Sequence, residues 1–285
     1  MAKKYIGIDI GGTKIHLGIV SGNQILKEIQ FPTPAHLPEK EIIEQLFEYI
    51  DSLFSEDITG FGIGVPGLVD ENEGIIYDLW NIPSWKKVAL KDILEKKYSR
   101  PAKITNDANT FALGEKYYGK GQNYKNLVAV SLGTGFGTGI IANHQLYSGT
   151  LSGAGELGDI PYQDKTIEDY CSGKFFSGVY AEEGKKLFHK AEADDLEALK
   201  IFENYGRHLG NALKIILYTL APEAIFLGGS ISRSFPYFEK SMWESIHSFP
   251  FKKVTQNLIV EVSEIENIAL LGAVSLFENS KMKEY

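Results

Sequence analysis

The chain has 285 residues, of which 44% are hydrophobic and 23% charged, and its formal net charge is −8 at pH 7. This length can supply two domains with substantial cores, and the composition excludes a disordered protein. The net acidity, without a cluster of Lys and Arg, argues against a nucleic-acid partner. The longest apolar region, residues 213–227, is interrupted by Lys214, Pro222 and Glu223, so we expect no membrane partner. A lone cysteine, Cys171, and the lack of a signal-type apolar start predict a cytoplasmic protein.

Hydrophobic periodicity predicts an α/β protein whose two halves begin alike. In the first half we expect strands at 4–10, 14–20, 24–31, 59–65 and 102–105, and helices at 39–54, 89–97 and 107–118. In the second half we expect strands at 127–132, 138–142, 144–147 and 224–228, a long helix over 195–219 and a final helix from Ile268 to Phe277. This repetition implies two α/β domains related by duplication, with a cleft between them.

We place a small N-terminal domain at residues 1–117 and a large domain at 118–268. The final helix, within residues 269–285, is expected to return to the small domain and complete it. Each half then has its own sheet and its own core.

A glycine-rich turn follows the first strand of each half, at residues 8–14 and again at residues 131–139. Each turn lies between two runs of β-forming residues, which predicts a hairpin rather than a strand-to-helix connection. Successive backbone N–H groups in such a turn can face one oxyanion, and Thr13 and Thr134 each add a hydroxyl donor. Two such turns can hold a polyphosphate.

Two other glycine-rich stretches imitate nucleotide motifs. Residues 62–67 satisfy G-x-G-x-x-G, but Pro66 stands where a Rossmann helix should begin. Residues 114–121 approach a P-loop, but they lack its final Ser or Thr and follow a helical pattern, so we interpret them as the end of a helix.

Three further motifs accompany the two hairpins: Asn106-Asp107-Ala108-Asn109, residues 153–158 (GAGELG) and Gly228-Gly229-Ser230. Together these motifs resemble the ROK family (repressors, open reading frames and kinases), over nearly the whole chain and in the family's order. The resemblance implies two actin-like ATPase (ribonuclease H-like) domains around a cleft. It also implies phosphorylation of a hexose hydroxyl, typically at C6, with ATP and Mg²⁺, and a homodimer.

The resemblance assigns roles to particular residues. Asp107 matches the catalytic base. The positions that match the ATP phosphate and adenosine sites are Asp9, Gly11, Gly12, Thr13, Lys14, Gly133, Thr134, Gly135, Gly228 and Gly229. The positions that match sugar-binding residues are Gly67, Asn81, Asn106, Asp107, Glu156, Asp159 and Glu168.

The acidic residues also have plainer interpretations. Asp9 suits a water-mediated Mg²⁺ contact, because Mg²⁺ keeps several waters and takes one or two carboxylates, yet it could instead cap its own turn. Asp107 follows a strand and begins a helix, so it could be an ordinary N-cap. Glu156 and Glu168 can accept hydrogen bonds from sugar hydroxyls, although Glu168 could also be a solvated acid at a helix start.

The chain departs from the family between Asp159 and Glu168. Many ROK proteins have a histidine at the first position, followed by a loop with three cysteines that bind structural zinc. Here that histidine is Asp159, the loop is reduced to a turn around residues 161–164, and Cys171 lies beyond it. We therefore expect no zinc. The three carboxylates of Glu156, Asp159 and Glu168 would favour a cationic partner, for which an amino sugar is one candidate; Asp159 could alternatively turn away.

Other functions remain open. Inorganic polyphosphate could replace ATP as donor, or the chain could be a sugar sensor without catalysis, or an actin-like ATPase that acts on something other than a sugar. The repressor branch of the family carries a winged-helix segment ahead of the first turn, and eight residues precede Asp9 here, so we expect no DNA binding.

Overall fold

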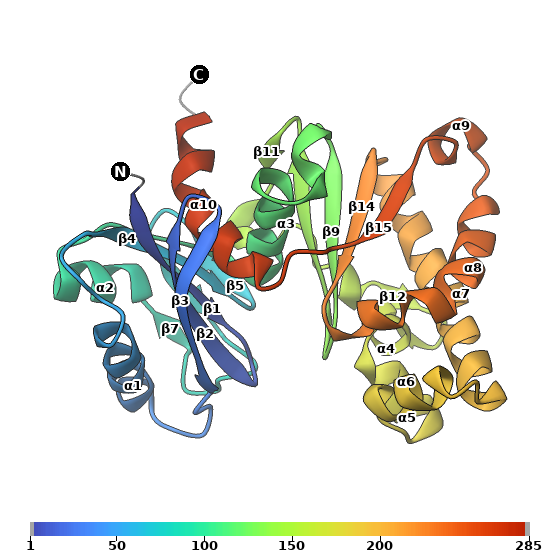
Figure 1. The fold of residues 1–285 in the computed structure, drawn as a ribbon, viewed down its shortest axis with the longest axis horizontal. Helices are drawn as coiled ribbons and strands as arrows, with labels where there is room; N and C mark the ends of the chain where they lie inside the picture. The colour runs from blue at the N-terminus through green and yellow to red at the C-terminus, as the bar shows by residue number, and fades with distance from the viewer. Residues whose placement is uncertain (1–2, 283–285) are drawn as a thin grey trace. The chain divides into compact units, whose positions relative to one another are not determined.

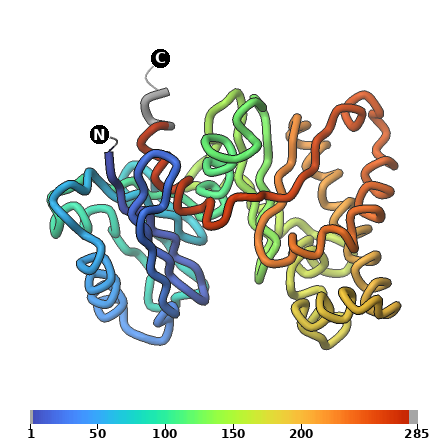
Figure 2. The backbone as a smooth tube through the Cα atoms, viewed as in Figure 1, coloured from blue at the N-terminus to red at the C-terminus, as the bar shows by residue number. Residues whose placement is uncertain are grey.

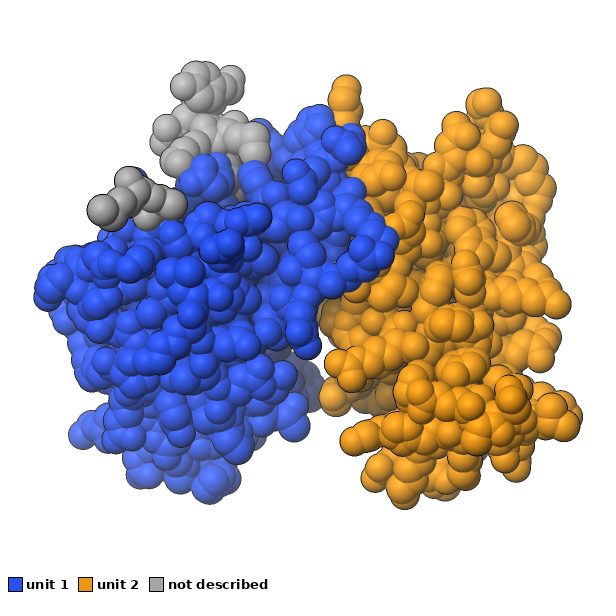
Figure 3. All heavy atoms as spheres, in the orientation of Figure 1, with its two compact units in different colours: residues 1–123, 139–155, 264–285 blue, residues 124–138, 156–263 orange. Residues whose placement is uncertain are grey.

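The chain folds into two compact units, which have different colours in Figure 3. The computed structural model describes residues 3–282. Within that range, the first unit comprises the residues up to 123, residues 139–155 and the residues from 264 onward. The second unit comprises residues 124–138 and 156–263. Among residues 3–282, no helix has the length and apolar character needed to cross a membrane.

The first unit is built around a sheet with the strand order β3-β2-β1-β4-β8. Its strands are β1 (Lys4–Ile10), β2 (Lys14–Ser21), β3 (Gln24–Pro32), β4 (Ile58–Val65) and β8 (Ala102–Asn106). β2 is antiparallel to both β1 and β3, whereas β1, β4 and β8 run parallel. The carboxyl ends of the parallel strands therefore meet at one edge, the edge at which open α/β sheets bind ligands.

Two helix pairs cover this sheet. They are α1 (Glu39–Asp51) and α2 (Leu90–Tyr98) on one face, and α3 (Asp107–Tyr117) and α10 (Ile268–Met282) on the other (Figure 1). Ile6 and Ile8 of β1 belong to one core cluster with Ile42 and Leu46 of α1, and all four side chains are buried. Since successive residues of a strand alternate between faces, the alternate residues of β1, such as Gly7, face α10.

Glycine lets α10 approach the sheet and α3 closely. A Cβ on Gly62 of β4 would lie 2.1 Å from the carbonyl oxygen of Ala273, and one on Gly272 would lie 1.7 Å from that of Thr110. Figure 2 shows the red C-terminal helix beside the blue N-terminal strands. The residues from 264 onward, which include this helix, group with the first unit.

A small antiparallel sheet follows β4. Its strands are β5 (Leu68–Asp70), β6 (Ile75–Tyr77) and β7 (Lys87–Val88). Because β5 begins three residues after Val65, the chain does not form a helix where a Rossmann motif needs one, and the dinucleotide interpretation of residues 62–67 is excluded. The P-loop imitation is the C-terminal end of α3, where the Gly119 N–H donates to the Gly114 carbonyl over 3.1 Å.

A second sheet has the strand order β11-β10-β9-β14-β15. Its strands are β9 (Leu127–Leu132), β10 (Phe136–Ala142), β11 (Gln145–Leu146), β14 (Ala224–Gly228) and β15 (Ile259–Val262). β9, β14 and β15 are parallel, and β10 is antiparallel to β11, so the topology of the first sheet is repeated. The duplication inferred from the sequence is therefore visible in both sheets.

The second unit is mostly helical beyond its sheet. Its helices are α4 (Ile167–Cys171), α5 (Gly173–Tyr180), α6 (Gly184–Glu192), α7 (Leu196–Thr219), α8 (Phe235–His247) and α9 (Lys252–Thr255). α7 carries an apolar stripe that includes Phe202, Tyr205 and Leu209, and these side chains are buried with Phe238 and Met242 of α8. This packing fills the core of the unit.

Residues 139–155 group with the first unit rather than with the large domain in which the sequence-based division placed them. The reason is local packing: a Cβ on Gly139 would lie 2.2 Å from the Ala108 carbonyl oxygen in α3. The grouping also differs from that division at residues 118–123 and 264–268.

Candidate active site

The first glycine-rich turn joins β1 to β2 as a hairpin, as predicted, with Ile10 opposite Ile15. The Gly11 N–H donates to the Lys14 carbonyl over 2.9 Å. A Cβ on Gly12 would lie 2.7 Å from Cγ of Asn81, so glycine lets the Asn81 side chain lie directly against the turn. Thr13 and Lys14 are exposed beside it. The turn therefore offers backbone N–H and hydroxyl donors to an anion, and the Asn81 amide lies against it.

Asp9 and Asp107 lie at the carboxyl edge of the first sheet. Asp9 pairs with Gly64 of β4, Gly64 pairs with Thr105 of β8, and Asp107 follows β8 directly. Both side chains are half-buried. Burial, reinforced by the negative charge of Asp107, raises the pKa of Asp9 to about 7, although Lys14 opposes this rise. Burial also raises the pKa of Asp107, although the hydrogen bond from the Ala108 N–H lowers it.

Asn106 caps α3, so the N-cap interpretation of Asp107 is wrong. The Asn106 Oδ1 accepts from the Ala108 N–H over 2.8 Å, and Asp107 is the first residue of the helix. Asp107 Oδ1 accepts from the same N–H over 2.9 Å. Asn106 Nδ2 donates to the Gly67 carbonyl over 3.1 Å, which holds Gly67 in its left-handed conformation (φ +79°) next to the start of α3.

The second glycine-rich turn joins β9 to β10, which are neighbours in the second sheet, and is therefore a hairpin as predicted. The Gly133 N–H donates to the Gly135 carbonyl over 3.1 Å, and the Gly133 carbonyl accepts from the Gly173 N–H over 2.8 Å. Thr134 at the tip is exposed. The first residue of α5 thus holds the turn through this backbone hydrogen bond.

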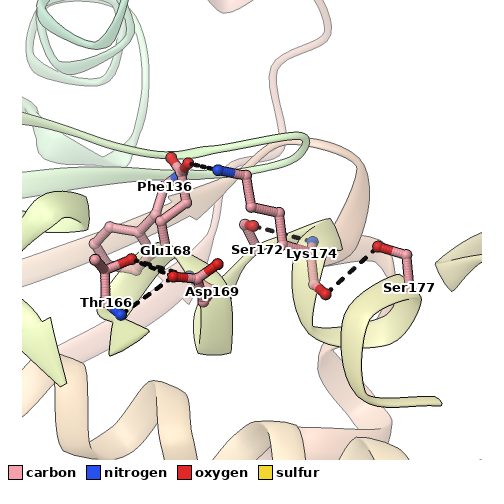
Figure 4. Close-up of polar contacts among 7 residues, drawn as sticks. All are labelled: Phe136, Thr166, Glu168, Asp169, Ser172, Lys174 and Ser177. Carbon is pink, nitrogen blue, oxygen red and sulfur yellow. Dashed lines mark hydrogen bonds and ion pairs between the residues drawn. The ribbon is translucent and has the colours of Figure 1, made fainter. Parts of the chain in front are cut away.

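Glu168 binds this second turn directly (Figure 4). Its Oε2 accepts from the Phe136 N–H over 3.0 Å, and its Oε1 accepts from Lys174 Nζ over 2.6 Å. Glu168 is therefore no solvated acid at a helix start. The N-terminus of α4 is capped instead by Thr166 and Asp169, which form a reciprocal capping box.

Lys174 is the site residue that the sequence reasoning missed. The hydrogen bond to Glu168 raises the pKa of Lys174, and the charges of Glu168, Asp169 and Asp159 raise it further. The carboxylates around Glu168 therefore have a cationic partner within the chain. The signal in the sequence was a single lysine six residues after Glu168, a spacing that brings the two side chains together only because the chain turns between α4 and α5.

The shortened loop is a two-residue hairpin between β12 (Pro161–Tyr162) and β13 (Lys165–Thr166). Asp159 precedes it, exposed, at the end of the short 3₁₀ helix η3 (Leu157–Asp159), and Glu156 is exposed just before η3. Cys171 is buried in the core, and this burial raises the pKa of its thiol. The described residues contain no group of three or more His, Cys, Asp or Glu able to hold a metal ion.

Gly228 and Gly229 lie at the carboxyl edge of the second sheet, as the second turn does. Gly228 ends β14 opposite Ser131 of β9. Gly229 has a φ of +83°, and a Cβ there would lie 2.4 Å from the Leu132 carbonyl oxygen, so both its conformation and its surroundings require glycine. Ser232 Oγ donates to the Gly229 carbonyl over 2.8 Å and fixes the bend.

The structure thus gathers the predicted residues into two sets. One set, at the edge of the first sheet, consists of Asp9, Gly11, Gly12, Thr13, Lys14, Gly67, Asn81, Asn106 and Asp107. The other, in the second unit, consists of Gly133, Thr134, Gly135, Glu168, Gly228 and Gly229, with Glu156 and Asp159 around η3.

The chain matches the model of the ROK family over residues 5–280. It is 30% identical to an N-acetyl-D-glucosamine kinase of Histophilus somni, over 96% of this chain and 98% of that protein. It is 29% identical to a xylose repressor of Bacillus subtilis, over 95% of this chain and 76% of the repressor.

The fold has solved counterparts. A ROK family glucokinase from Streptomyces griseus, crystallised with glucose and AMPPNP, superposes with a TM-score of 0.82 and is 26% identical, over 96% of this chain and 98% of that one. The chain therefore has the actin-like ATPase fold. The chain contains one cysteine and therefore lacks a motif of several zinc-binding cysteines. Because the family model covers nearly the whole chain, this protein belongs to the ROK family, as a variant without that motif.

Proposed function

We propose that this protein is a sugar kinase that transfers the γ-phosphoryl group of ATP to a hydroxyl of a hexose or hexose derivative, at C6. The observation that carries the proposal is the pair of half-buried acids, Asp9 and Asp107, at the ligand-binding edge of the first sheet beside a glycine-rich turn. A carboxylate kept in a poorly solvated place at an energetic cost is typical of a functional site.

Asp107 is the proposed base. It accepts the proton of the sugar hydroxyl while that oxygen forms a bond to the γ-phosphorus and the bond from phosphorus to the leaving oxygen of ADP breaks. Burial raises the pKa of Asp107 and so makes it a stronger base than an ordinary aspartate. Its Oδ1 bond to the Ala108 N–H fixes the direction of the carboxylate.

The two glycine-rich turns and Lys14 are the proposed phosphate ligands, with Gly228 and Gly229 next to the adenosine. Burial and the nearby charge of Asp107 raise the pKa of Asp9 to about 7, and a divalent cation beside these two carboxylates would offset both effects, so the residues fit Mg²⁺. Mg²⁺ would neutralise charge on the phosphates. Asp9 would hold it through water, because Mg²⁺ keeps several waters and takes one or two carboxylates.

The proposed sugar ligands are Gly67, Asn81, Asn106, Glu156, Asp159 and Glu168. Asn106 is already held by Ala108 and Gly67 and so presents a fixed amide. Because Lys174 forms an ion pair with Glu168, that carboxylate does not need a cationic sugar as its partner. We therefore favour a neutral hexose or an N-acetyl derivative over a free amino sugar.

The test is sugar-dependent release of ADP. The purified protein with ATP and Mg²⁺ is offered glucose, mannose, N-acetylglucosamine, N-acetylmannosamine and glucosamine one at a time. We expect turnover with at least one neutral sugar and little ADP release without sugar. A sugar-independent ATPase, or no turnover with any hexose derivative, would overturn the proposal.

Two alternatives are answered by the same preparation. Replacing ATP with inorganic polyphosphate tests the second donor; the match of Gly228 and Gly229 to the family's adenosine site favours ATP, and the similar glucokinase was crystallised with AMPPNP. The second alternative is a non-catalytic sugar sensor, which the similarity to a xylose repressor supports. Sugar binding without phosphorylation would identify such a sensor. A cytoplasmic homodimer that binds no nucleic acid belongs to the same proposal, and light scattering of the purified protein measures its mass.

A further inference from the structure

One carboxylate of the first unit, that of Glu71, has no place in the proposed chemistry and yet is bound by three hydroxyl groups. Glu71 Oε1 accepts from Thr105 Oγ1 over 2.5 Å and from Ser152 Oγ over 3.1 Å, and its Oε2 accepts from Ser148 Oγ over 3.1 Å. An ionised carboxylate only accepts hydrogen bonds, so it suits three donors arranged around it. Glu71 thereby joins segments that are far apart in the sequence.

The backbone of Glu71 is itself held in place. It follows β5 in a turn that the Asp70 side chain closes, since Asp70 Oδ1 accepts from the N–H groups of Asn72 and Glu73 over 3.0 Å each. The Gly74 N–H donates to the Asp70 carbonyl over 2.7 Å. The carboxylate is therefore presented from a fixed turn rather than from a freely moving loop.

On one side the hydrogen bonds lead to the proposed base. Thr105 is fully buried and lies two residues before Asp107. Its Oγ1 also accepts from Asn109 Nδ2 over 3.1 Å, and Asn109 lies two residues after Asp107, in the first turn of α3. The chain of bonds from Glu71 thus fixes the backbone before and after Asp107.

On the other side the bonds lead to a strained loop, residues 148–155. Leu151 and Ser152 have φ values of +52° and +55°, in the left-handed region that favours glycine. A residue with a side chain persists in this region only where its surroundings hold it. Ser152 is 2% exposed, and Glu71 accepts its hydroxyl bond. A serine at this position supplies the hydroxyl that a glycine would lack.

We propose that Glu71 is a positioning residue, whose carboxylate holds loop 148–155 against the end of β8 and thereby sets the orientation of Asp107. This inference rests on the proposed function, because that proposal gives Asp107 its role. Glu71 touches neither substrate nor nucleotide in this scheme. Its effect passes through Thr105 and Ser152.

The variants separate position from charge. Glu71→Ala removes all three bonds, and we expect kcat/KM for the sugar to fall at least tenfold while KM for ATP changes less than about twofold. Glu71→Gln keeps them, because its oxygen can accept from Thr105 and Ser152 and its amide can donate to Ser148, so kcat/KM stays within about threefold of the parent. Glu73→Ala, two residues along the same turn with an exposed side chain, is the matched control and should behave as the parent.

A second change tests the route through the loop. Since glycine adopts a positive φ without support, Ser152→Gly in the Glu71→Ala background should recover part of the lost kcat/KM. Hydrogen exchange gives a readout that needs no activity: amides of residues 148–155 should exchange faster in Glu71→Ala than in the parent or in Glu73→Ala. Unchanged exchange, or unchanged kcat/KM in Glu71→Ala, would overturn the positioning role. Absence of any kinase activity in the parent would instead overturn the proposed function, and the exchange result would still decide whether Glu71 holds the loop.

Discussion

Asp107 is the residue on which the proposed chemistry depends most. Replacement by Asn keeps the size of the side chain but removes the proton acceptor, so kcat should fall at least about 10²-fold while sugar affinity changes little. Steady-state kinetics and equilibrium sugar binding measure the two quantities. A variant with near-normal kcat would show that Asp107 is not the base.

The raised pKa of Asp107 also has a consequence for stability. The folded state binds a proton at this site more tightly than the unfolded state, so the free energy of unfolding falls as pH rises above the ordinary aspartate range. Asp107→Asn removes a buried charge and should melt higher than the parent at pH 8, with the difference vanishing near pH 4. Thermal melts at both values measure this, and a lower melting temperature at pH 8 would contradict the sign. The same melts show that any loss of activity in the variant is not loss of folding.

Lys174 determines the charge balance around Glu168. Lys174→Met leaves that carboxylate without its ion pair at 2.6 Å, so the site should come to favour a cationic sugar. Since exposed ion pairs contribute at most about 1 kcal/mol, we expect the ratio of kcat/KM for glucosamine to that for glucose to rise about three- to fivefold. Lys174→Arg keeps the charge and serves as control. An unchanged ratio in Lys174→Met would remove Lys174 from sugar selection.

Among the elements, α10 shows how closely the first unit is packed. Gly272→Ala would place a Cβ 1.7 Å from the Thr110 carbonyl oxygen, a backbone atom that cannot move without shifting α3. We expect a loss of about 1–3 kcal/mol in the free energy of unfolding. Gly178→Ala in α5, with no atom within 4 Å of the new Cβ, should be neutral or slightly stabilising. Chemical denaturation compares the two, and equal effects would mean that α10 does not pack on α3 in this way.

The regular elements could be predicted from the sequence because their signals are local. β1, β9 and β14 have the predicted bounds, and α7 differs by one residue at its start. The small sheet β5-β6-β7 could not be predicted in this way, because its strands have two or three residues each and no periodicity to detect. The end of α1 at Asp51, short of the predicted Phe54, is a boundary that depends on packing rather than pattern.

The features of the candidate site also divide into those with a local signal in the sequence and those without one. The glycine-rich turns and the Asn106-Asp107 string were recognisable because glycine and capping residues act on their own backbone. The Glu168–Lys174 pair and the three hydroxyl bonds to Glu71 were not, because each depends on a fold that joins separate segments. The capping role moved from Asp107 to Asn106, since only the structure shows which residue precedes the first helical one.

At the scale of the whole molecule, two sheets with the same topology carry different groups. The carboxyl edge of the first carries the acids Asp9 and Asp107, and that of the second carries glycines at positions 133, 135, 228 and 229. Under the proposed function, the first unit supplies the base and one phosphate-binding turn, and the second supplies the other turn and the glycines next to the adenosine. The family membership agrees with this account, and the chain lacks the zinc-binding cysteine motif, with a short hairpin at residues 161–166.

The most direct test follows the phosphoryl group itself. The protein is incubated with Mg²⁺, ATP labelled at the γ-phosphate, and a neutral hexose or N-acetylhexosamine, and the products are separated. Our account predicts that the label appears in a sugar 6-phosphate with the parent protein and that this transfer falls at least about 10²-fold with Asp107→Asn. Label found only in inorganic phosphate, or equal transfer by both proteins, would contradict it.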